Sequence, residues 1–253
     1  MISQLKPEET YVTIRQIQNP EILMATKFKL CSFKTCPWVH RAAIVLQEKN
    51  IDYEIEYIDR DNRPAWFLAI SPHSKVPVLI VDDDKALFES NAIAEYLDEV
   101  TLPRLHPKDA LKRAYNRAWN DFVPVCSKIT HLTDAENEED LSKRCDEVRI
   151  IFEKLEKALV QRGDGRPYFN GAEFSLTDAS YAPALMRFTF FDRIHPLGLI
   201  EEFPFVAAWR DALMTRPSVL AAVVPDFEHY WQEVLREKGG GASQFVPGAA
   251  AAE

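Results

Sequence analysis

Apolar and polar positions follow two different periods between residues 27 and 101. Short apolar or alternating runs are typical of strands, whereas apolar residues three or four positions apart over longer segments are typical of helices. Runs of the first kind are Phe28–Phe33, the strictly alternating Tyr53–Ile58, which predicts a half-buried strand, and the two stretches beside the turn at Asp82–Asp84. Runs of the second kind are Cys36–Asn50, Arg63–Ile70 and Ser90–Val100. Their order predicts an α/β domain with the topology βαβαββα.

After residue 101 the pattern is helical almost throughout. Pro103 and Pro107 interrupt both periods, which is typical of a linker between domains. We expect helices at about 108–131, 138–162, 175–192, 203–215 and 226–237. The chain is therefore predicted to hold the α/β domain at 27–101 and an all-α domain at 108–237, with an N-terminal extension at 1–26 and a flexible, low-complexity tail at 238–253.

The charge of the chain argues against nucleic acid and anionic lipid as partners. Its formal net charge is -9 at pH 7, whereas proteins that bind nucleic acid or anionic lipid need a basic face. No apolar run approaches the ~20 residues that a membrane span requires, and the first residues lack the apolar segment of a secretory signal. We therefore expect a cytoplasmic protein with no nucleic-acid and no membrane partner.

The cysteines are few: Cys31, Cys36, Cys126 and Cys145. They form no C-x-x-C pair and have no histidines at the spacing of zinc ligands, so we expect neither a metal site nor a disulfide scaffold. A cysteine that takes part in chemistry would then act singly.

Cys36 opens the segment TCPWVHRA, in which a strand gives way to a helix. Pro37 suits the first helical position, where no backbone N–H is needed. The thiol would face the unpaired N–H groups of the helix start, whose partial positive charge favours the reactive thiolate. His40 and Arg41, one turn later, would add to this potential unless they face water. The alternative is a buried cysteine that serves only as a small apolar residue.

Two further segments combine a structural and a binding interpretation. In SKVPVL, Pro77 precedes a strand, and a cis bond between Val76 and Pro77 would leave the Val76 backbone free to pair with an extended peptide ligand. A trans proline at a sheet edge is the alternative.

In FESNAIAEYL, Ser90 suits the N-cap of the next helix. Alternatively, Ser90 and the helix start would bind a carboxylate while Glu89 faces an ammonium group.

The helical half offers mainly structural signals. Ser175 and Asp178 have the spacing of a capping box at the start of a helix. Large aromatic side chains on helices usually pack in the core, although one or two of them would border an apolar substrate pocket. The candidates for such a pocket are Tyr115, Trp119, Phe122 and Phe188.

Together these segments resemble the glutathione transferase superfamily. The resemblance is carried by TCPWVHR, NRPAWFLAISPHSKVPVL and FESNAIAEYLDE in this order, followed by the SLTD capping box, and extends from about Phe28 to Trp231. It implies a thioredoxin-like N-terminal domain followed by the all-helical C-terminal domain of this superfamily.

Within the superfamily, the Cys-Pro-aromatic sequence is similar to the cysteine-type branch, which includes the omega, lambda and dehydroascorbate-reductase classes. The resemblance implies that Cys36 is catalytic, that it forms a mixed disulfide with glutathione, and that the protein is a homodimer. Arg63 stands at the position of a lysine that reaches the glycyl carboxylate of glutathione, and Lys75 is a second basic candidate. The implied glutathione-binding residues are Trp38, Arg63, Lys75, Val76, Pro77, Glu89 and Ser90.

The expected function is that of a glutathione-dependent thiol transferase or reductase. Glutathione is the cosubstrate, no metal is involved, and the second substrate is a small electrophile or disulfide, such as a mixed disulfide, a phenacyl thioether of glutathione or dehydroascorbate. One alternative is a catabolic enzyme that uses glutathione to remove halogen or to cleave aryl thioethers or ethers. Another is a non-catalytic binding or regulatory protein, which would be expected to lose Cys36.

Overall fold

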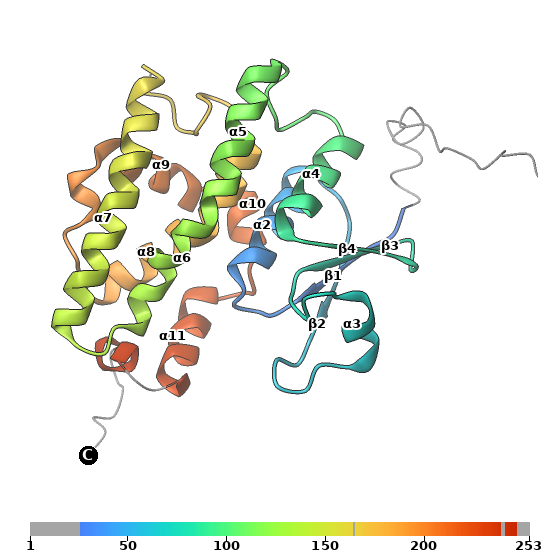
Figure 1. The fold of residues 1–253 in the computed structure, drawn as a ribbon, viewed down its shortest axis with the longest axis horizontal. Coiled ribbons are helices and arrows are strands. Elements are labelled where there is room, and N and C mark those ends of the chain that lie inside the picture. Colours follow the sequence, from blue (N-terminus) through green and yellow to red (C-terminus); the bar gives the residue numbers. More distant parts are fainter. Residues whose placement is uncertain (1–25, 164, 239–240, 247–253) are drawn as a thin grey trace, which may run out of the picture.

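The computed structural model describes residues 26–163, 165–238 and 241–246. Figure 1 shows a small sheet domain beside a larger helical domain. The first domain follows the predicted order: β1 (Phe28–Ser32), α2 (Pro37–Glu48), β2 (Glu54–Tyr57), α3 (Ala65–Ile70), β3 (Val78–Val81), β4 (Lys85–Phe88) and α4 (Ser90–Val100). The fold class expected from the sequence is therefore confirmed.

The sheet has the strand order β2-β1-β3-β4. β1 pairs in parallel with β2 and antiparallel with β3, and β3 forms a hairpin with β4. Residues on both faces of β1 and β3 are buried, whereas all four residues of β2 are exposed. The alternation of Tyr53–Ile58 was expected to mark a half-buried strand, and this was wrong. β2 lies at the edge of the sheet, and its Ile55 and Tyr57 remain uncovered within the chain.

The second domain consists of helices only, within the described residues. Its α-helices are α5 (Ala110–Phe122), α6 (Ser127–Thr130), α7 (Glu138–Gln161), α8 (Leu176–Ile194), α9 (Pro204–Met214), α10 (Pro217–Ala221) and α11 (Phe227–Lys238). Short 3-10 helices lie at Val123–Cys126, His131–Asp134, Ile200–Glu202 and Gly241–Phe245. None of the helices described combines the length and the apolar character that crossing a membrane requires.

Two helix predictions need correction. The expected continuous helix at 108–131 ends at Phe122, and the chain passes through a 3-10 turn before α6 begins at Ser127. Pro124 lies in this turn, and a proline inside a helix removes one backbone hydrogen bond and clashes with the preceding turn. The helix α10 was not expected, although Pro217 at its first position is the same start signal that marks Pro37.

Helix α8 forms the centre of the helical domain. Its side chains are buried from Leu176 to Phe191, so it has no polar face, as expected for a helix surrounded by others. The predicted capping box at its start is present. The Asp178 carboxylate accepts hydrogen bonds from the Ser175 backbone N–H (2.8 Å) and hydroxyl (2.6 Å), and also from the Phe169 N–H (2.8 Å) and Trp209 Nε1–H (2.6 Å).

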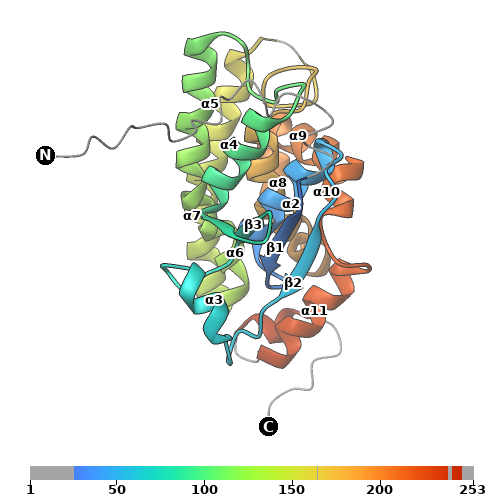
Figure 2. The ribbon, with the colours of Figure 1, turned by 90° about the vertical axis from the view of Figure 1, so that its right-hand side faces the viewer.

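The two domains meet along α2. This helix packs against α4 in its own domain and against α8 and α10 of the helical domain, as Figure 2 shows from the side. At its C-terminal end, Glu48 accepts two hydrogen bonds of 2.7 Å from the guanidinium of Arg216. The first residue of α2 follows Cys36 directly, so the packing of the domains fixes the surroundings of this cysteine.

Most of the two terminal segments lies outside the described residues. This applies to the predicted extension at 1–26, of which only Thr26 is described, and to residues 239–240 and 247–253 of the predicted tail. Within that predicted tail, Gly241–Phe245 forms a 3-10 helix. The ring of Phe245 lies 4.6 Å from that of His195 and 5.9 Å from that of Phe191, so this part of the tail packs on the end of α8.

Candidate active site

Cys36 lies at the N-cap of α2, at the end of the loop that follows β1. Pro37 occupies the first helical position, as predicted. The Cys36 N–H donates to the Phe33 carbonyl (3.1 Å), which closes the loop into a tight turn, and the Cys36 carbonyl accepts the first helical hydrogen bond from the His40 N–H (3.2 Å). The cysteine is half-buried. Its backbone is therefore fixed by the strand on one side and the helix on the other.

The electrostatic environment of the thiol differs from the sequence expectation. Burial raises the pKa of Cys36 above its ordinary value. The backbone N–H groups of Val39 and Trp38, followed by the charges of Arg187 and Arg60, lower the pKa but do not outweigh burial. The N–H groups at the helix start thus lower the pKa of Cys36, as predicted, but desolvation raises this pKa by more. His40 adds no positive charge, because burial and Arg187 hold the pKa of its imidazole well below the usual range.

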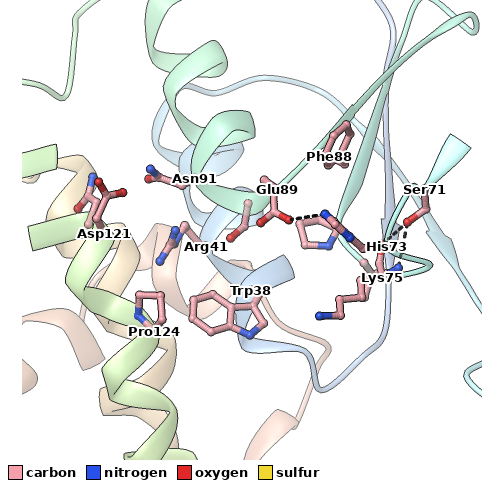
Figure 3. A pocket seen from close by; sticks show the side chains of 14 residues that line it. Trp38, Arg41, Ser71, His73, Lys75, Phe88, Glu89, Asn91, Asp121 and Pro124 are labelled. Carbon is pink, nitrogen blue, oxygen red and sulfur yellow. Dashed lines mark hydrogen bonds and ion pairs between the residues drawn. The ribbon is translucent and has the colours of Figure 1, made fainter. Parts of the chain in front are cut away.

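A cavity of about 410 Å³ lies beside the start of α2, within the size range typical of small-molecule sites. Its walls come from α2, the loop before β3, the start of α4 and the end of α5 (Figure 3). Among its lining residues are six of the predicted glutathione-binding residues: Trp38, Lys75, Val76, Pro77, Glu89 and Ser90. These residues are far apart in the sequence, so the fold brings them to one cavity.

The loop before β3 presents an unpaired stretch of backbone. The Val76–Pro77 peptide bond is cis, the form that would leave Val76 free for a ligand. Neither the N–H nor the carbonyl of Val76 has a hydrogen-bond partner within the described chain. The Ser71 hydroxyl holds the preceding turn, because it donates to the Lys75 carbonyl (2.8 Å) and accepts from the Lys75 N–H (2.9 Å). The edge at Val76 is therefore fixed and open to an extended peptide.

The start of α4 differs from the prediction by one residue. Glu89, not Ser90, is the N-cap, and Ser90 is the first helical residue. Glu89 has a φ of 69°, a conformation that a residue with a side chain adopts rarely and that concentrates at functional sites. The Ser90 side chain is buried, and the exposed Glu89 carboxylate lies 3.9 Å from His73 Nε2. An acidic group, a hydroxyl and a helix N-terminus thus face the cavity together.

The two basic candidates lie in different places. Lys75 lines the cavity, whereas Arg63 does not. The guanidinium of Arg63 lies 5.9 Å from the centre of the Phe33 ring, and that of Arg60 lies 5.0 Å from it. Both arginines are therefore beside the loop that leads to Cys36, and Lys75 is the basic residue of the cavity itself.

The four aromatic pocket candidates do not line the cavity beside α2. Phe188 is fully buried, with its ring 5.1 Å from that of Phe152. Trp119 packs edge-on against Phe122, at a distance of 5.5 Å between ring centres. Tyr115 is half-exposed and borders a separate hollow near the interdomain linker. Three of the candidates thus take part in packing, as large aromatic residues on helices usually do.

A smaller cavity of about 110 Å³ lies on the other side of Pro37 and Trp38. The helical domain supplies the rest of its wall: Val123, Cys126, Ser127, Thr130, His131, Ser180, Pro183 and Ala184. Sequence reasoning did not find it, because the wall residues are mostly small and come from four separate helical segments. Trp38 lines both this cavity and the larger one.

Sequence reasoning also did not place Arg41, Asn120 and Asp121 in the cavity beside α2. Arg41 is buried, and its guanidinium lies 5.3 Å from the centre of the Trp38 ring. Its Nε and Nη2 have no hydrogen-bond partner in the described chain. The available signal was an arginine among the apolar positions of the first helix, which is uncommon because buried cations need partners.

Comparisons with known protein families match most of these segments. The family profile described as "Glutathione S-transferase, N-terminal domain" matches residues 35–100. The profile described as "Glutathione S-transferase, C-terminal domain" matches residues 139–212. The first match contains Cys36 and all residues of the cavity that precede the linker.

Individual proteins show the same similarity along most of their length. The chain is 31% identical to glutathione S-transferase omega-1 from Sus scrofa, over 76% of this chain and 79% of that protein. It is 30% identical to the probable glutathione S-transferase DHAR1, cytosolic, from Oryza sativa subsp. japonica, over 73% of this chain and 82% of that protein. The crystal structure of glutathione transferase Omega 3C from Trametes versicolor superposes with a TM-score of 0.70 at 27% identity, and the match covers 90% of this chain and 96% of that one.

Proposed function

Because the chain belongs to the glutathione S-transferase family, we propose that it is a glutathione-dependent thiol transferase or reductase of the omega-like type, with Cys36 as its nucleophile. The observation that carries the proposal is the position of Cys36. It is the N-cap of α2, two residues before Trp38, which lines the cavity; the lining also combines a free backbone edge, a buried serine at a helix start and a glutamate. These groups suit glutathione, an extended and anionic tripeptide.

Glutathione would lie along the cavity with its sulfur toward Cys36. The Val76 backbone would pair with the cysteinyl part as an added strand. Glu89 would face the γ-glutamyl ammonium, while Ser90 and the N–H groups at the start of α4 would bind the neighbouring carboxylate. Lys75 would balance the glycyl carboxylate, with Arg63 as the second basic candidate. Trp38 would wall the cavity on the side of α2.

The reaction is a pair of thiol–disulfide exchanges. The Cys36 thiolate attacks the glutathionyl sulfur of a mixed disulfide, so that a bond forms between Cys36 and glutathione and the other thiolate leaves and takes up a proton. A second glutathione, as its thiolate, then attacks the glutathionyl sulfur on Cys36. Oxidised glutathione leaves and the Cys36 thiolate returns. The thiol of this second glutathione is the reductant, because the first glutathione enters as the glutathionyl half of the substrate disulfide, and no second protein cysteine is needed.

The smaller cavity beyond Trp38 would receive the non-glutathione part of the substrate. Its walls are mainly apolar, with hydroxyl groups from Ser127, Thr130 and Ser180. At about 110 Å³ it admits a small group only. This favours small disulfides, small thioethers of glutathione or compounds of the size of dehydroascorbate as second substrates.

We place the protein in the cytoplasm as a homodimer. Its N-terminal domain carries exposed Trp66, Leu68 and Phe88, between 41% and 45% exposed, which a partner subunit would cover. The name of the rice relative includes the word cytosolic, and glutathione is kept reduced in that compartment. Light scattering after size exclusion should give twice the chain mass of 29.0 kDa. A monomer at all concentrations would refute the dimer.

The test of the function is the glutathione-dependent reduction of hydroxyethyl disulfide by the wild type, Cys36→Ser and the control Cys145→Ser. Cys145 lies on α7, lines neither of the two cavities, and burial raises the pKa of its thiol. We expect activity in the wild type and Cys145→Ser, and at least a ~100-fold loss in Cys36→Ser, because the remaining hydroxyl is a poor nucleophile. Activity confined to chlorinated or aryl-ether substrates would instead support a catabolic enzyme.

A further inference from the structure

Arg187 reaches from the helical domain to the loop that carries Cys36. It lies on α8 and is only 4% exposed. Its Nη1 donates to the Pro183 carbonyl (2.7 Å) on its own helix. Its Nη2 crosses the domain interface, donates to the Thr35 carbonyl (2.7 Å) and lies 3.1 Å from His40 Nδ1. Arg187 is therefore a direct hydrogen-bonded link between α8 and the residue before Cys36.

The contact with Arg187 determines the protonation of His40. A guanidinium can only donate hydrogen bonds, so His40 Nδ1 must accept and the imidazole must be neutral, with its proton on Nε2. His40 Nε2 lies 3.1 Å from the Lys34 carbonyl, to which this proton is donated. The lowered pKa of His40 agrees with this assignment.

Arg187 and His40 together hold both carbonyls that precede the cysteine. The Lys34 carbonyl accepts from His40 and the Thr35 carbonyl accepts from Arg187. The Cys36 N–H closes the same turn on the Phe33 carbonyl. The carbonyls of Phe33, Lys34 and Thr35 and the Cys36 N–H thus all have partners, and the partner of the Thr35 carbonyl, next to Cys36, comes from the helical domain.

Arg187 is also a buried cation without a carboxylate partner. No aspartate or glutamate of the described residues forms an ion pair with it, and its contacts are neutral acceptors and the Phe227 ring (5.3 Å). Burial lowers the pKa of Arg187 to about 10, so the group stays charged at neutral pH. The ionisable group whose charged form attracts it is Cys36, as its thiolate. A buried charge without a counter-charge is costly.

We propose that Arg187 is the positioning residue of the Cys36 loop and that its guanidinium serves as the counter-ion of the Cys36 thiolate. The proposal rests on the proposed function, in which the thiolate is the nucleophile. The other groups that act on the sulfur are Arg60, from the loop after β2, and the N–H groups of Trp38 and Val39, from α2; the imidazole of His40 is uncharged. The helical domain thereby tunes the nucleophile of the other domain.

The experiment measures the rate at which iodoacetamide alkylates Cys36 as a function of pH, followed by mass spectrometry of the Cys36 peptide. Iodoacetamide is neutral, so removing an arginine does not change its attraction to the site. The variants are Arg187→Gln, which removes the charge, and Arg187→Lys, which keeps it. The control is Arg193→Gln, on the same helix, whose guanidinium forms an exposed ion pair with Glu228 (2.6 Å).

In Arg187→Gln we expect the midpoint of alkylation to rise by about one pH unit, which makes the reaction tenfold slower at any pH well below it. Arg187→Lys should shift the midpoint by less than half of that amount, and Arg193→Gln should leave it unchanged. A folded Arg187→Gln protein with the wild-type midpoint would overturn the proposal. Should Arg187→Gln not fold, a full-unit rise in folded Arg187→Lys would overturn it as well, because the charge is then not the cause.

The alkylation rate does not depend on turnover, which separates this proposal from the proposed function. A raised midpoint in Arg187→Gln would keep Arg187 as the counter-ion even if Cys36→Ser retained full activity. In that case the thiolate would have its counter-ion, and the nucleophile of the reaction would be another group. If Arg187→Gln has the wild-type midpoint and Cys36→Ser is inactive, the proposed function stands, but Arg187 is not the counter-ion of the thiolate.

Discussion

We predict that removing the Asp178 carboxylate lowers the free energy of unfolding by more than removing an exposed helix cap does. Both of its oxygens are saturated: one accepts from the Phe169 N–H and Trp209 Nε1–H, and the other from the N–H and hydroxyl of Ser175. The residue is fully buried at the start of α8. Substitution by alanine would leave three buried N–H donors without a partner, while the Ser175 hydroxyl is free to rotate.

Each unpaired buried donor costs about 1–3 kcal/mol of the free energy of unfolding. Water can enter the space left by the carboxylate and recover part of this, so we expect Asp178→Ala to lose ~4 kcal/mol. Asp178→Asn keeps one acceptor oxygen and should lose ~2 kcal/mol. The matched control is Asp109→Ala at the start of α5, where an exposed carboxylate accepts one hydrogen bond from the Lys112 N–H (2.9 Å). Loss of such a cap costs ~1 kcal/mol.

Urea unfolding followed by circular dichroism gives the free energy of unfolding of the three variants and the wild type. We expect the loss of free energy of unfolding to be largest in Asp178→Ala, smaller in Asp178→Asn and smallest in Asp109→Ala. If Asp178→Ala lost no more than Asp109→Ala, the buried donors would have other partners. The capping box would then be an ordinary helix cap.

Three further predictions concern the site and its support. Because burial raises the pKa of Cys36, alkylation of the free enzyme should become faster as the pH rises, with a midpoint above that of free cysteine; a rate that is already constant at pH 6 would contradict this. Glu89→Gln and Ser90→Ala should each raise the KM for glutathione roughly tenfold with little change in kcat, because each removes one contact to the glutamyl end; an unchanged KM in both would remove them from the site. Lys49→Met should lose ~3 kcal/mol of the free energy of unfolding, because it leaves the buried Asp98 carboxylate, 2.6 Å from Lys49 Nζ, without its cation; a loss below that of Asp109→Ala would contradict this.

The N-terminal domain could be predicted because its signals are local. Alternation and helical spacing are properties of neighbouring residues, and Pro37 marks its helix start through its own ring. The missed helix at Pro217–Ala221 is too short to show a period. The expected burial of Tyr53–Ile58 was wrong because alternation alone does not show whether a strand lies at the edge of the sheet.

The site was predicted in part for the same reason. Cys36 and Pro37 share one helix start, and the residues of the cavity came from a resemblance in three ordered motifs. The contacts of Arg187 join residues that are 152 and 147 positions apart, and no local pattern indicates such a pair. The raised pKa of Cys36 was missed because burial depends on the whole fold, whereas the helix start is visible in the sequence.

The central claim is that Cys36 forms a disulfide with glutathione, and the intact mass of the protein after exposure to oxidised glutathione tests it most directly. The wild type and Cys145→Ser should each gain a single adduct of ~305 Da, the mass of one glutathionyl group, which dithiothreitol removes. Cys36→Ser should gain none. An unmodified wild type, or an adduct that persists in Cys36→Ser, would contradict the assignment of Cys36 as the nucleophile.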